Sequence, residues 1–242
     1  MTAPLVEIRE LGFHYPDGTP ALDGVSLAVA RGERVAVLGP TGSGKSTLLQ
    51  HLNGLLRPTA GGVWIEGVTV DAGPGLSDIR RKVGLVFQDP NDQLFLPTLM
   101  EDVAFGPLND GVGPVDAAAR ATAMLRELGL DGVGARAAHH LSGGERRLAA
   151  LATVLVSRPV VLALDEPTGD LDARGRMRLV DLLRARGETL LVATHDLTLA
   201  RALCGRGVVL YGGRVVADRE LGALLADRAL LERYGLESPS GE

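Results

Sequence analysis

The stretch Gly39-Pro40-Thr41-Gly42-Ser43-Gly44-Lys45-Ser46-Thr47 decides the fold class of this chain. A strand-like run, Arg34 to Leu38, precedes it, and a helical pattern, Leu48 to Leu56, follows it. Glycines in such a loop let backbone N–H groups converge on phosphate oxygens, and the start of the helix adds positive potential. Lys45 supplies a point charge and Ser46 a hydroxyl that can bind magnesium. We therefore predict a phosphate-binding loop rather than a plain glycine-rich turn before a helix.

Composition limits the classes of protein that remain. The 242 residues, 45% of them apolar, suffice for one core with a smaller subdomain. With 25 Lys and Arg against 30 Asp and Glu, no positive excess is left to follow a nucleic acid backbone. Cys204 is the only cysteine, which excludes an internal disulfide and a cysteine metal cluster and fits a reducing cytoplasm. We expect no nucleic-acid partner.

Membrane contact is expected only through partners. The first residues, MTAPLVEIRE, reach acidic side chains too soon for a secretory signal. The longest uncharged and mainly apolar stretch, Leu148 to Val156, is far shorter than the roughly 20 residues that span a bilayer.

The first half of the chain begins with three short strand-like runs, Val6 to Leu11, Val25 to Ala30 and Val35 to Leu38. Turn signals, among them Asp17-Gly18 and Arg31-Gly32, separate these runs. We predict a small antiparallel layer from all three runs.

Later runs are almost wholly apolar and alternate with helical segments: Val83 to Phe87, Val160 to Leu164 and Leu190 to Ala193. This pattern is typical of parallel strands buried on both faces. Helical patterns, such as Val115 to Leu128, fill the interval from Asp89 to Arg158 and predict an inserted helical subdomain. Further along, we predict a hairpin around Gly212-Gly213, between Val208 to Leu210 and Val215 to Ala217, and a frayed end at Ser238 to Glu242.

Acidic and polar residues end several of these strands. Asp165 and Glu166 follow a buried strand, at the edge where α/β sheets bind ligands. Beside a phosphate loop, Asp165 would hold magnesium and Glu166 would polarise the attacking water. His195 and Gln88 also follow strands, so they can reach a γ-phosphate or the magnesium, although capping or solvated roles stay open for both.

Leu141-Ser142-Gly143-Gly144-Glu145 precedes a helical run, Arg146 to Val156. Ser142 is a good N-cap, and the two glycines expose backbone N–H groups, which makes a second anion site. The first loop already holds one nucleotide's phosphates, so this edge most economically serves a nucleotide on another copy. We predict a head-to-tail dimer with ATP between the chains; the alternative is a simple capped helix.

Taken in order along the chain, these elements resemble the ATPases of ABC transporters over nearly the whole sequence. By that resemblance Tyr15 stacks on adenine, Gln88 is the Q-loop glutamine, Leu141 to Glu145 form the signature motif, and His195 is the switch histidine. Asp172 would be the D-loop aspartate that crosses the dimer. Glu145 stands where many relatives have glutamine, and Gly169-Asp170 where other small residues are common, but neither change removes an atom that contacts phosphate.

The resemblance implies an α/β fold: a RecA-like P-loop NTPase core with an antiparallel β subdomain and an inserted α-helical subdomain. The expected boundaries are 1–88 and 159–225 for the core with its β layer, 89–158 for the helical subdomain, and 226–242 for a tail. ATP and Mg²⁺ are the expected cofactors, with Ser46, Gln88 and Asp165 as magnesium ligands.

A finer resemblance lies in Gln88 to Phe95, Glu101 to Pro107 and Leu52 to Pro58. These stretches are similar to the ATPases of energy-coupling-factor importers for cobalt, nickel, biotin and other vitamins. In such importers this region receives short helices of a transmembrane component, which would explain the apolar Leu94 and Phe95 in a polar loop; local packing is the alternative. The expected partners are a second ATPase, identical or closely related, a transmembrane coupling protein and a substrate-binding membrane component, at the cytoplasmic face of the cell membrane.

Three other functions remain possible from the sequence. A soluble ABC protein of translation or DNA repair usually carries two cassettes or a coiled coil, and neither is present. A non-catalytic nucleotide-binding subunit would not need Lys45, Asp165, Glu166 and His195 together. An exporter shares the same chemistry, and only the neighbourhood of Gln88 favours import.

Overall fold

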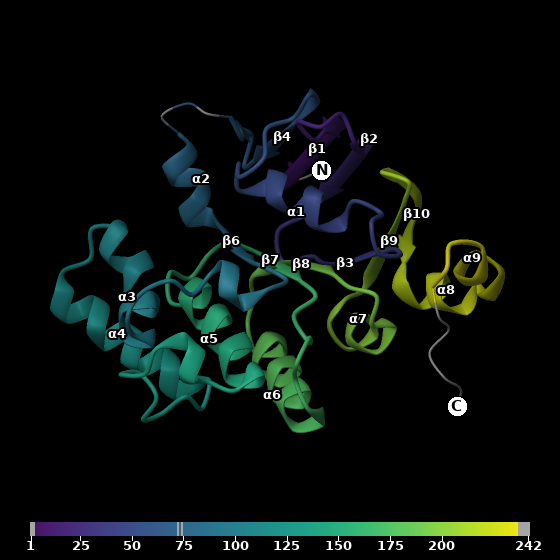
Figure 1. The fold of residues 1–242 in the computed structure, drawn as a ribbon. Coiled ribbons are helices and arrows are strands. Elements are labelled where there is room, and N and C mark those ends of the chain that lie inside the picture. The colour runs from purple at the N-terminus through teal and green to yellow at the C-terminus, as the bar shows by residue number, and fades with distance from the viewer. Residues whose placement is uncertain (1–2, 72, 74, 237–242) are drawn as a thin grey trace.

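A computed structural model describes residues 3–71, 73 and 75–236, and its backbone forms two β-sheets with helices around them (Figure 1). The smaller sheet is antiparallel, in the order β2-β1-β4-β5. Its strands are β1 (Val6–His14), β2 (Pro20–Val29), β4 (Ala60–Ile65) and β5 (Val68–Thr69). The predicted antiparallel layer is thus confirmed for the runs at Val6 and Val25.

The larger sheet has six strands in the order β10-β9-β3-β8-β7-β6. They are β3 (Arg34–Leu38), β6 (Val83–Val86), β7 (Val161–Asp165), β8 (Thr189–Ala193), β9 (Arg206–Tyr211) and β10 (Arg214–Glu220). All neighbours pair in parallel except β9 and β10, which form the predicted antiparallel hairpin. Parallel pairing of β3, β8, β7 and β6 brings their carboxyl ends to one edge of the sheet.

The prediction that Val35 to Leu38 belongs to the antiparallel layer is wrong. This run lies in β3, between β8 and β9, and its pairing with both strands is parallel. All four residues are fully buried, as expected for a strand covered on both faces. The antiparallel layer is completed instead by β4, whose sequence Ala60-Gly61-Gly62 gives little strand signal.

Helices cover both faces of the larger sheet (Figure 1). They are α1 (Lys45–Leu52), α2 (Leu76–Lys82), α3 (Leu99–Asn109), α4 (Pro114–Glu127), α5 (Gly143–Leu155), α6 (Ala173–Arg184), α7 (Leu197–Leu203), α8 (Leu221–Ala226) and α9 (Arg228–Arg233), with 3₁₀ turns η1 (Pro90–Asp92) and η2 (Ala138–His140). Leu48, Leu49 and Leu52 of α1 are fully buried in one apolar cluster with residues of both sheets, so α1 lies between them. On the opposite face of the larger sheet, a second apolar cluster contains buried residues from each of the helices α3 through α9.

The segment 89–158 holds α3, α4 and α5, which contact one another and lie together at one side of the molecule (Figure 1). The segment assigned to a tail contains α9, and Leu231 and Leu236 are buried in the core. The frayed end predicted at Ser238 to Glu242 falls outside the described residues. Among the helices that the structure describes, none has the length and apolar character needed to cross a bilayer.

Candidate functional site

The predicted phosphate loop joins β3 to α1, and its backbone is shaped by glycines at two crowded points. Gly39 and Gly44 have φ of 153° and 103°, which disfavour a side chain. A Cβ at Gly39 would come within 2.3 Å of the Leu210 carbonyl oxygen, and one at Gly44 within 2.6 Å of the Ala21 carbonyl oxygen. The loop therefore follows a path that only glycine permits, with the first turn of α1 opening toward it.

Lys45 is buried against the loop that it follows. Its Nζ donates to the carbonyl oxygens of Gly39 and Pro40, at 2.7 and 3.0 Å. Burial lowers the pKa of Lys45, while the charges of Glu166 and Asp165 raise it. The lysine and the two acids therefore share one electrostatic environment, although the lysine begins α1 and the acids lie at the end of β7.

The β9–β10 hairpin supports the loop from outside. The Gly213 N–H donates to the Ser43 carbonyl at 3.2 Å, and the Asp23 N–H donates to the Gly213 carbonyl at 2.9 Å. Arg214 forms an ion pair with Asp23. The hairpin thus connects the phosphate loop to the start of β2.

Asp165 ends β7 and is 4% exposed. Burial raises its pKa, while a hydrogen bond from the Ser46 side chain lowers it. Its Oδ1 has no hydrogen-bond partner in the described part of the chain. A hydroxyl and a buried carboxylate with a free oxygen fit Mg²⁺, which takes one or two protein oxygens and completes its shell with phosphate and water.

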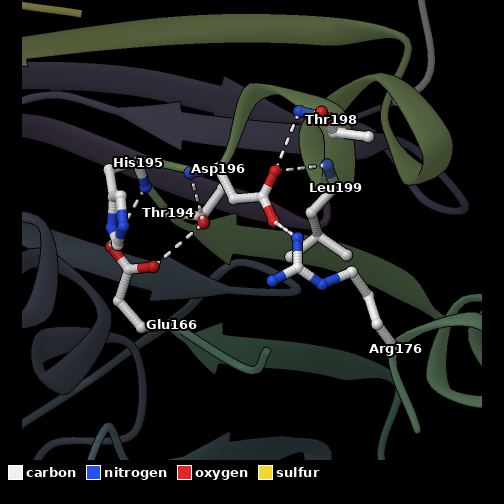
Figure 2. A network of polar contacts seen from close by, with 7 residues as sticks. All are labelled: Glu166, Arg176, Thr194, His195, Asp196, Thr198 and Leu199. Atoms are coloured by element: carbon white, nitrogen blue, oxygen red, sulfur yellow. Dashed lines mark hydrogen bonds and ion pairs between the residues drawn. The ribbon is translucent and has the colours of Figure 1, made fainter. Parts of the chain in front are cut away.

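Glu166 follows directly and is held by the end of β8 (Figure 2). Its Oε1 accepts from the backbone N–H of His195 at 3.0 Å and lies 2.8 Å from His195 Nδ1, and its Oε2 accepts from the Thr194 hydroxyl at 2.9 Å. The Glu166 side chain is 15% exposed, whereas that of His195 is 77% exposed. The backbone of Glu166 has φ of 44°, a left-handed conformation that costs energy in a residue with a side chain and often marks a functional position.

The network continues to α6 through Asp196 (Figure 2). The Asp196 N–H donates to the Thr194 hydroxyl, and its Oδ1 caps α7 by accepting from the N–H groups of Thr198 and Leu199. Its Oδ2 accepts from Arg176 Nη1 at 2.6 Å. The carboxylate of Glu166 is therefore fixed by a chain of bonds that reaches the helix after Asp172.

A cavity of about 550 Å³, here called the Glu166 cavity, collects residues that the sequence analysis placed at separate strand ends. Gln88, Glu166 and His195 line it, together with Arg147 and Arg176. Its volume leaves room for a water and a phosphate group, and its walls carry a carboxylate acceptor and an exposed imidazole. The sheet order explains this grouping, because β6, β7 and β8 are adjacent.

The predicted second anion site forms a separate cavity of about 570 Å³, here called the Ser142 cavity. Ser142 caps α5 with a reciprocal pair: Glu145 N–H donates to Ser142 Oγ at 3.3 Å, and Ser142 N–H donates to Glu145 Oε2 at 2.8 Å. The first-turn N–H groups of Gly143 and Gly144 point out of the helix, where an anion can accept them. Leu141 is buried beneath this turn.

Asp172 lines the same Ser142 cavity. It caps α6, because its Oδ1 accepts from the Gly175 N–H at 2.7 Å. The two predicted contact points for a second chain, the signature motif and the D-loop aspartate, thus lie beside each other.

Tyr15 lies next to the phosphate loop, where its hydroxyl bonds with Thr47 Oγ1 at 2.8 Å. Its ring meets Phe13 edge to face, and 38% of the residue is exposed. The stacking of this ring on adenine stays a prediction.

Leu94 and Phe95, expected together at a membrane partner, differ in the structure. Leu94 is 7% exposed and belongs to the core, so local packing accounts for it. Phe95 is 66% exposed and contacts Phe105 of α3 edge to face, with centroids 5.3 Å apart. Only Phe95 keeps the surface position that contact with a partner requires.

Three residues near these sites escaped the sequence analysis. Thr194 and Arg176 support Glu166, as described above, and Arg147 reaches the Glu166 cavity from α5. Thr194 had a detectable signal, since it directly follows the same strand that delivers His195. Arg147 had none, because a charged residue within an amphipathic helix is normally solvated.

Comparison with known proteins identifies the family of the chain. Residues 22–169 match the model of the family described as ABC transporter. The chain is 45% identical to an energy-coupling factor transporter ATP-binding protein, EcfA, of Methanothermobacter thermautotrophicus, covering 97% of this chain and 77% of that protein. It is 48% identical to a cobalt import ATP-binding protein, CbiO, of Rhodobacter capsulatus, covering 98% and 86%.

A solved structure shows the same fold over nearly the full length. CbiO1 of Clostridium perfringens, described as part of the ABC transporter complex CbiONQ, superposes with a TM-score of 0.80 at 34% identity, covering 98% of this chain and 96% of that one. The expected α/β fold with a P-loop NTPase core is therefore confirmed. The chain belongs to the ABC transporter family, as an ATP-binding subunit that hydrolyses ATP to drive transport and is related to the ATPases of energy-coupling-factor importers.

Proposed function

We propose that this chain powers the import of a small micronutrient, as the ATPase of an energy-coupling-factor transporter. The cargo is a transition-metal ion such as cobalt or nickel, or a vitamin such as biotin. Full-length similarity to relatives named for energy coupling and cobalt import supports this proposal. The chain works at the cytoplasmic face of the cell membrane, bound to a transmembrane coupling protein and a substrate-binding membrane component.

The nucleotide is held by the loop from Gly39 to Thr47. Backbone N–H groups and Lys45 hold the phosphates, and Tyr15 stacks on the adenine. Ser46, Asp165 and Gln88 hold Mg²⁺, which neutralises charge on the phosphate oxygens when bound. The free Oδ1 of Asp165, in the described part of the chain, and its contact with Ser46 support this ligand set.

One observation carries the chemical assignment: the Glu166 carboxylate is fixed at the wall of its cavity by Thr194 and His195. A carboxylate held in this way accepts a proton from the water that attacks the γ-phosphate without first having to reorient. His195 and Gln88 line the same cavity, and in this proposal they contact the γ-phosphate and the water.

Two copies, or this chain and a close relative, close head to tail around two ATP molecules. Each nucleotide is held by the loop from Gly39 to Thr47 of one chain, the Lys45 loop, and by the signature motif from Leu141 to Glu145 of the other, the Ser142 edge. Asp172 crosses between the two chains. ADP lacks the phosphate that the second chain binds, so hydrolysis shifts the population to the open form. This opening moves the membrane component.

The membrane component docks beside α3. A groove of about 470 Å³ lies between the core and the helical subdomain, lined by Arg80 and Phe105 among others. Phe105 is 42% exposed and contacts the exposed Phe95, so the groove continues into an apolar patch. Such a surface suits a short amphipathic helix laid into the groove.

The test is Glu166→Gln, which keeps the shape of the side chain and removes its charge. We expect ATP binding and ATP-dependent dimerisation to persist, while phosphate release falls about 10²–10⁴-fold, as for loss of a general base. The matched control is Glu232→Gln on the surface of α9, with parental activity expected. Hydrolysis by Glu166→Gln at the parental rate would show that another group acts as the base.

Export is the competing function, because ATP binding and hydrolysis by such a subunit do not determine the direction of transport. The surface around Phe95 favours import, since it corresponds to the stretch that resembles importer ATPases. Identifying the membrane proteins that copurify with the chain distinguishes the two directions and narrows the cargo.

A further inference from the structure

Arg147 is a buried cation that joins α5 to two loops of the core. It lies five residues after Ser142 and is 5% exposed. Its Nε donates to the Gly169 carbonyl at 3.2 Å, and its Nη1 donates to the carbonyls of Phe87 and Gln88, at 3.3 and 2.5 Å. One guanidinium therefore binds the loop that carries Gln88 and the loop that follows Glu166.

Fold stability alone does not explain a charge at this place. Burial lowers the pKa of Arg147, whereas the nearby charges of Asp170, Asp89, Asp165 and Glu166 raise it, and Asp170 lies 3.7 Å from Arg147 Nη2 in an ion pair. Buried charges are costly, and well-packed apolar side chains often replace them without loss of stability. The position of Arg147 at the wall of the Glu166 cavity gives it a second use.

The contact between Arg147 and the loop that follows Glu166 is also close. A Cβ on Gly169 would come within 2.6 Å of Arg147 Nη2, so the guanidinium lies directly against this backbone. Gly169 N–H donates to the Glu166 carbonyl at 3.2 Å, which ties the contact to the proposed base. Arg147 therefore touches the backbone of Gln88 itself and reaches Glu166 through one residue.

We propose that Arg147 is a positioning residue that sets Gln88 and Glu166 for hydrolysis and relays movement of α5 to both. The helix α5 begins at the Ser142 edge, so a second chain that binds this edge displaces α5 and, through Arg147, the two loops. This inference rests on the roles proposed above for Gln88 and Glu166.

The experiment compares Arg147→Met and Arg147→Lys with the parent chain at full length. Methionine keeps the length and apolar bulk and removes the planar donors, whereas lysine keeps the charge without the fork that binds two loops. We expect Arg147→Met to lower kcat for phosphate release about 10–100-fold, the range that corresponds to losing hydrogen bonds made by a charged group. Arg147→Lys should fall between Arg147→Met and the parent.

Two further readouts separate positioning from a purely structural role. The affinity for a fluorescent ATP analogue should stay within about 2-fold, because the Lys45 loop is untouched. In a Gln88→Ala background, Arg147→Lys should cost markedly less than in the parent, because residues that act through one another are not additive. Arg126→Gln on α4, with a side chain 72% exposed, is the control and should match the parent.

A parental kcat in both Arg147 variants, equal losses with and without Gln88, or a parallel loss of ATP affinity and kcat would each overturn the proposal. If Arg147→Met does not fold, Arg147→Lys decides by the same criteria. Measuring Glu166→Gln in parallel separates the two hypotheses: full activity there refutes the proposed base, whereas inactive Glu166→Gln with active Arg147 variants refutes only the relay.

Discussion

The Glu166 cavity and the Ser142 cavity are similar in size but differ in how their polar groups are used. In the first, the Glu166 carboxylate accepts three bonds from Thr194 and His195 within the same chain. In the second, the Ser142 and Glu145 groups satisfy each other, and the N–H groups of Gly143 and Gly144, in the first turn of α5, need no partner within the helix. Among the described residues, neither cavity is lined by a residue of the Lys45 loop, so the two differ in these bonds alone. One cavity is therefore arranged for chemistry, and the other offers donors for a phosphate that another chain must bring.

The largest expected effect tests whether one nucleotide is bound by the Lys45 loop of one chain and by the Ser142 edge of another. Lys45→Ala removes the phosphate-binding charge, and Gly144→Asp places a carboxylate at the outward-facing turn of α5, so each variant alone should lose hydrolysis about 100-fold. Mixing them should restore roughly a quarter of parental activity, because half of the dimers are mixed and one of their two sites is intact. Phosphate release in the mixture measures this directly.

The control for that experiment is the fold of Gly144→Asp. A Cβ at Gly144 meets nothing closer than 3.6 Å, and an acidic side chain favours a helix start, so its thermal unfolding should match the parent. A mixture no more active than the separate variants would contradict a head-to-tail dimer of identical chains.

A smaller effect tests the support inside the Glu166 cavity. Thr194→Val keeps the volume of a fully buried side chain but removes its bonds to Glu166 and to the Asp196 N–H. We expect kcat to fall about 10-fold, the cost of one hydrogen bond to a charged group, with little change in the KM for ATP. Steady-state kinetics measure both, and Thr198→Val, at an exposed position, should behave as the parent. A raised KM with unchanged kcat would place Thr194 in binding instead.

The smallest effect concerns stability. Burial raises the pKa of Asp165 above 3.8, so the folded chain holds the proton more tightly than the unfolded chain does. Such a group favours folding below 3.8, and that contribution is lost as pH rises through the folded pKa. At neutral pH, without Mg²⁺ or nucleotide, Asp165→Asn should therefore raise the Tm by about 2–4 °C.

Thermal unfolding across pH checks the sign of that effect. The difference between Asp165→Asn and the parent should shrink as pH falls toward 3.8, and Asp131→Asn, a side chain 64% exposed, should show no difference. A lower Tm for Asp165→Asn at neutral pH would mean that Asp165 stabilises the fold through its bond with Ser46.

The strand-end residues could be predicted from the sequence because parallel strands impose a common edge. Gln88, Asp165 and His195 each follow a buried apolar run, and the sheet order places these runs side by side. The capping box at Ser142 could be predicted in part. Ser142 was predicted as an N-cap, and the structure adds the reciprocal bond from the Ser142 N–H to the Glu145 side chain. Local patterns decide such features.

The remaining features depend on contacts distant in sequence. Arg147 binds carbonyls 60 and 59 residues earlier in the chain, and no local pattern marks that contact. Leu94 lies in a polar loop, and its burial is decided by the helices of the second apolar cluster. Val35 to Leu38 has the composition of either sheet, so its place beside β8 and β9 was fixed only by pairing.

The family model ends at residue 169, yet the nucleotide loop rests on a hairpin that begins at Arg206. Gly213 holds the Ser43 carbonyl, and the Leu210 carbonyl sets the space that Gly39 must fit. The recognisable motif is thus shorter than the unit that gives it its shape. Exchanging this loop between relatives without the hairpin would leave out the backbone that supports it, so the hairpin and the loop form one structural unit.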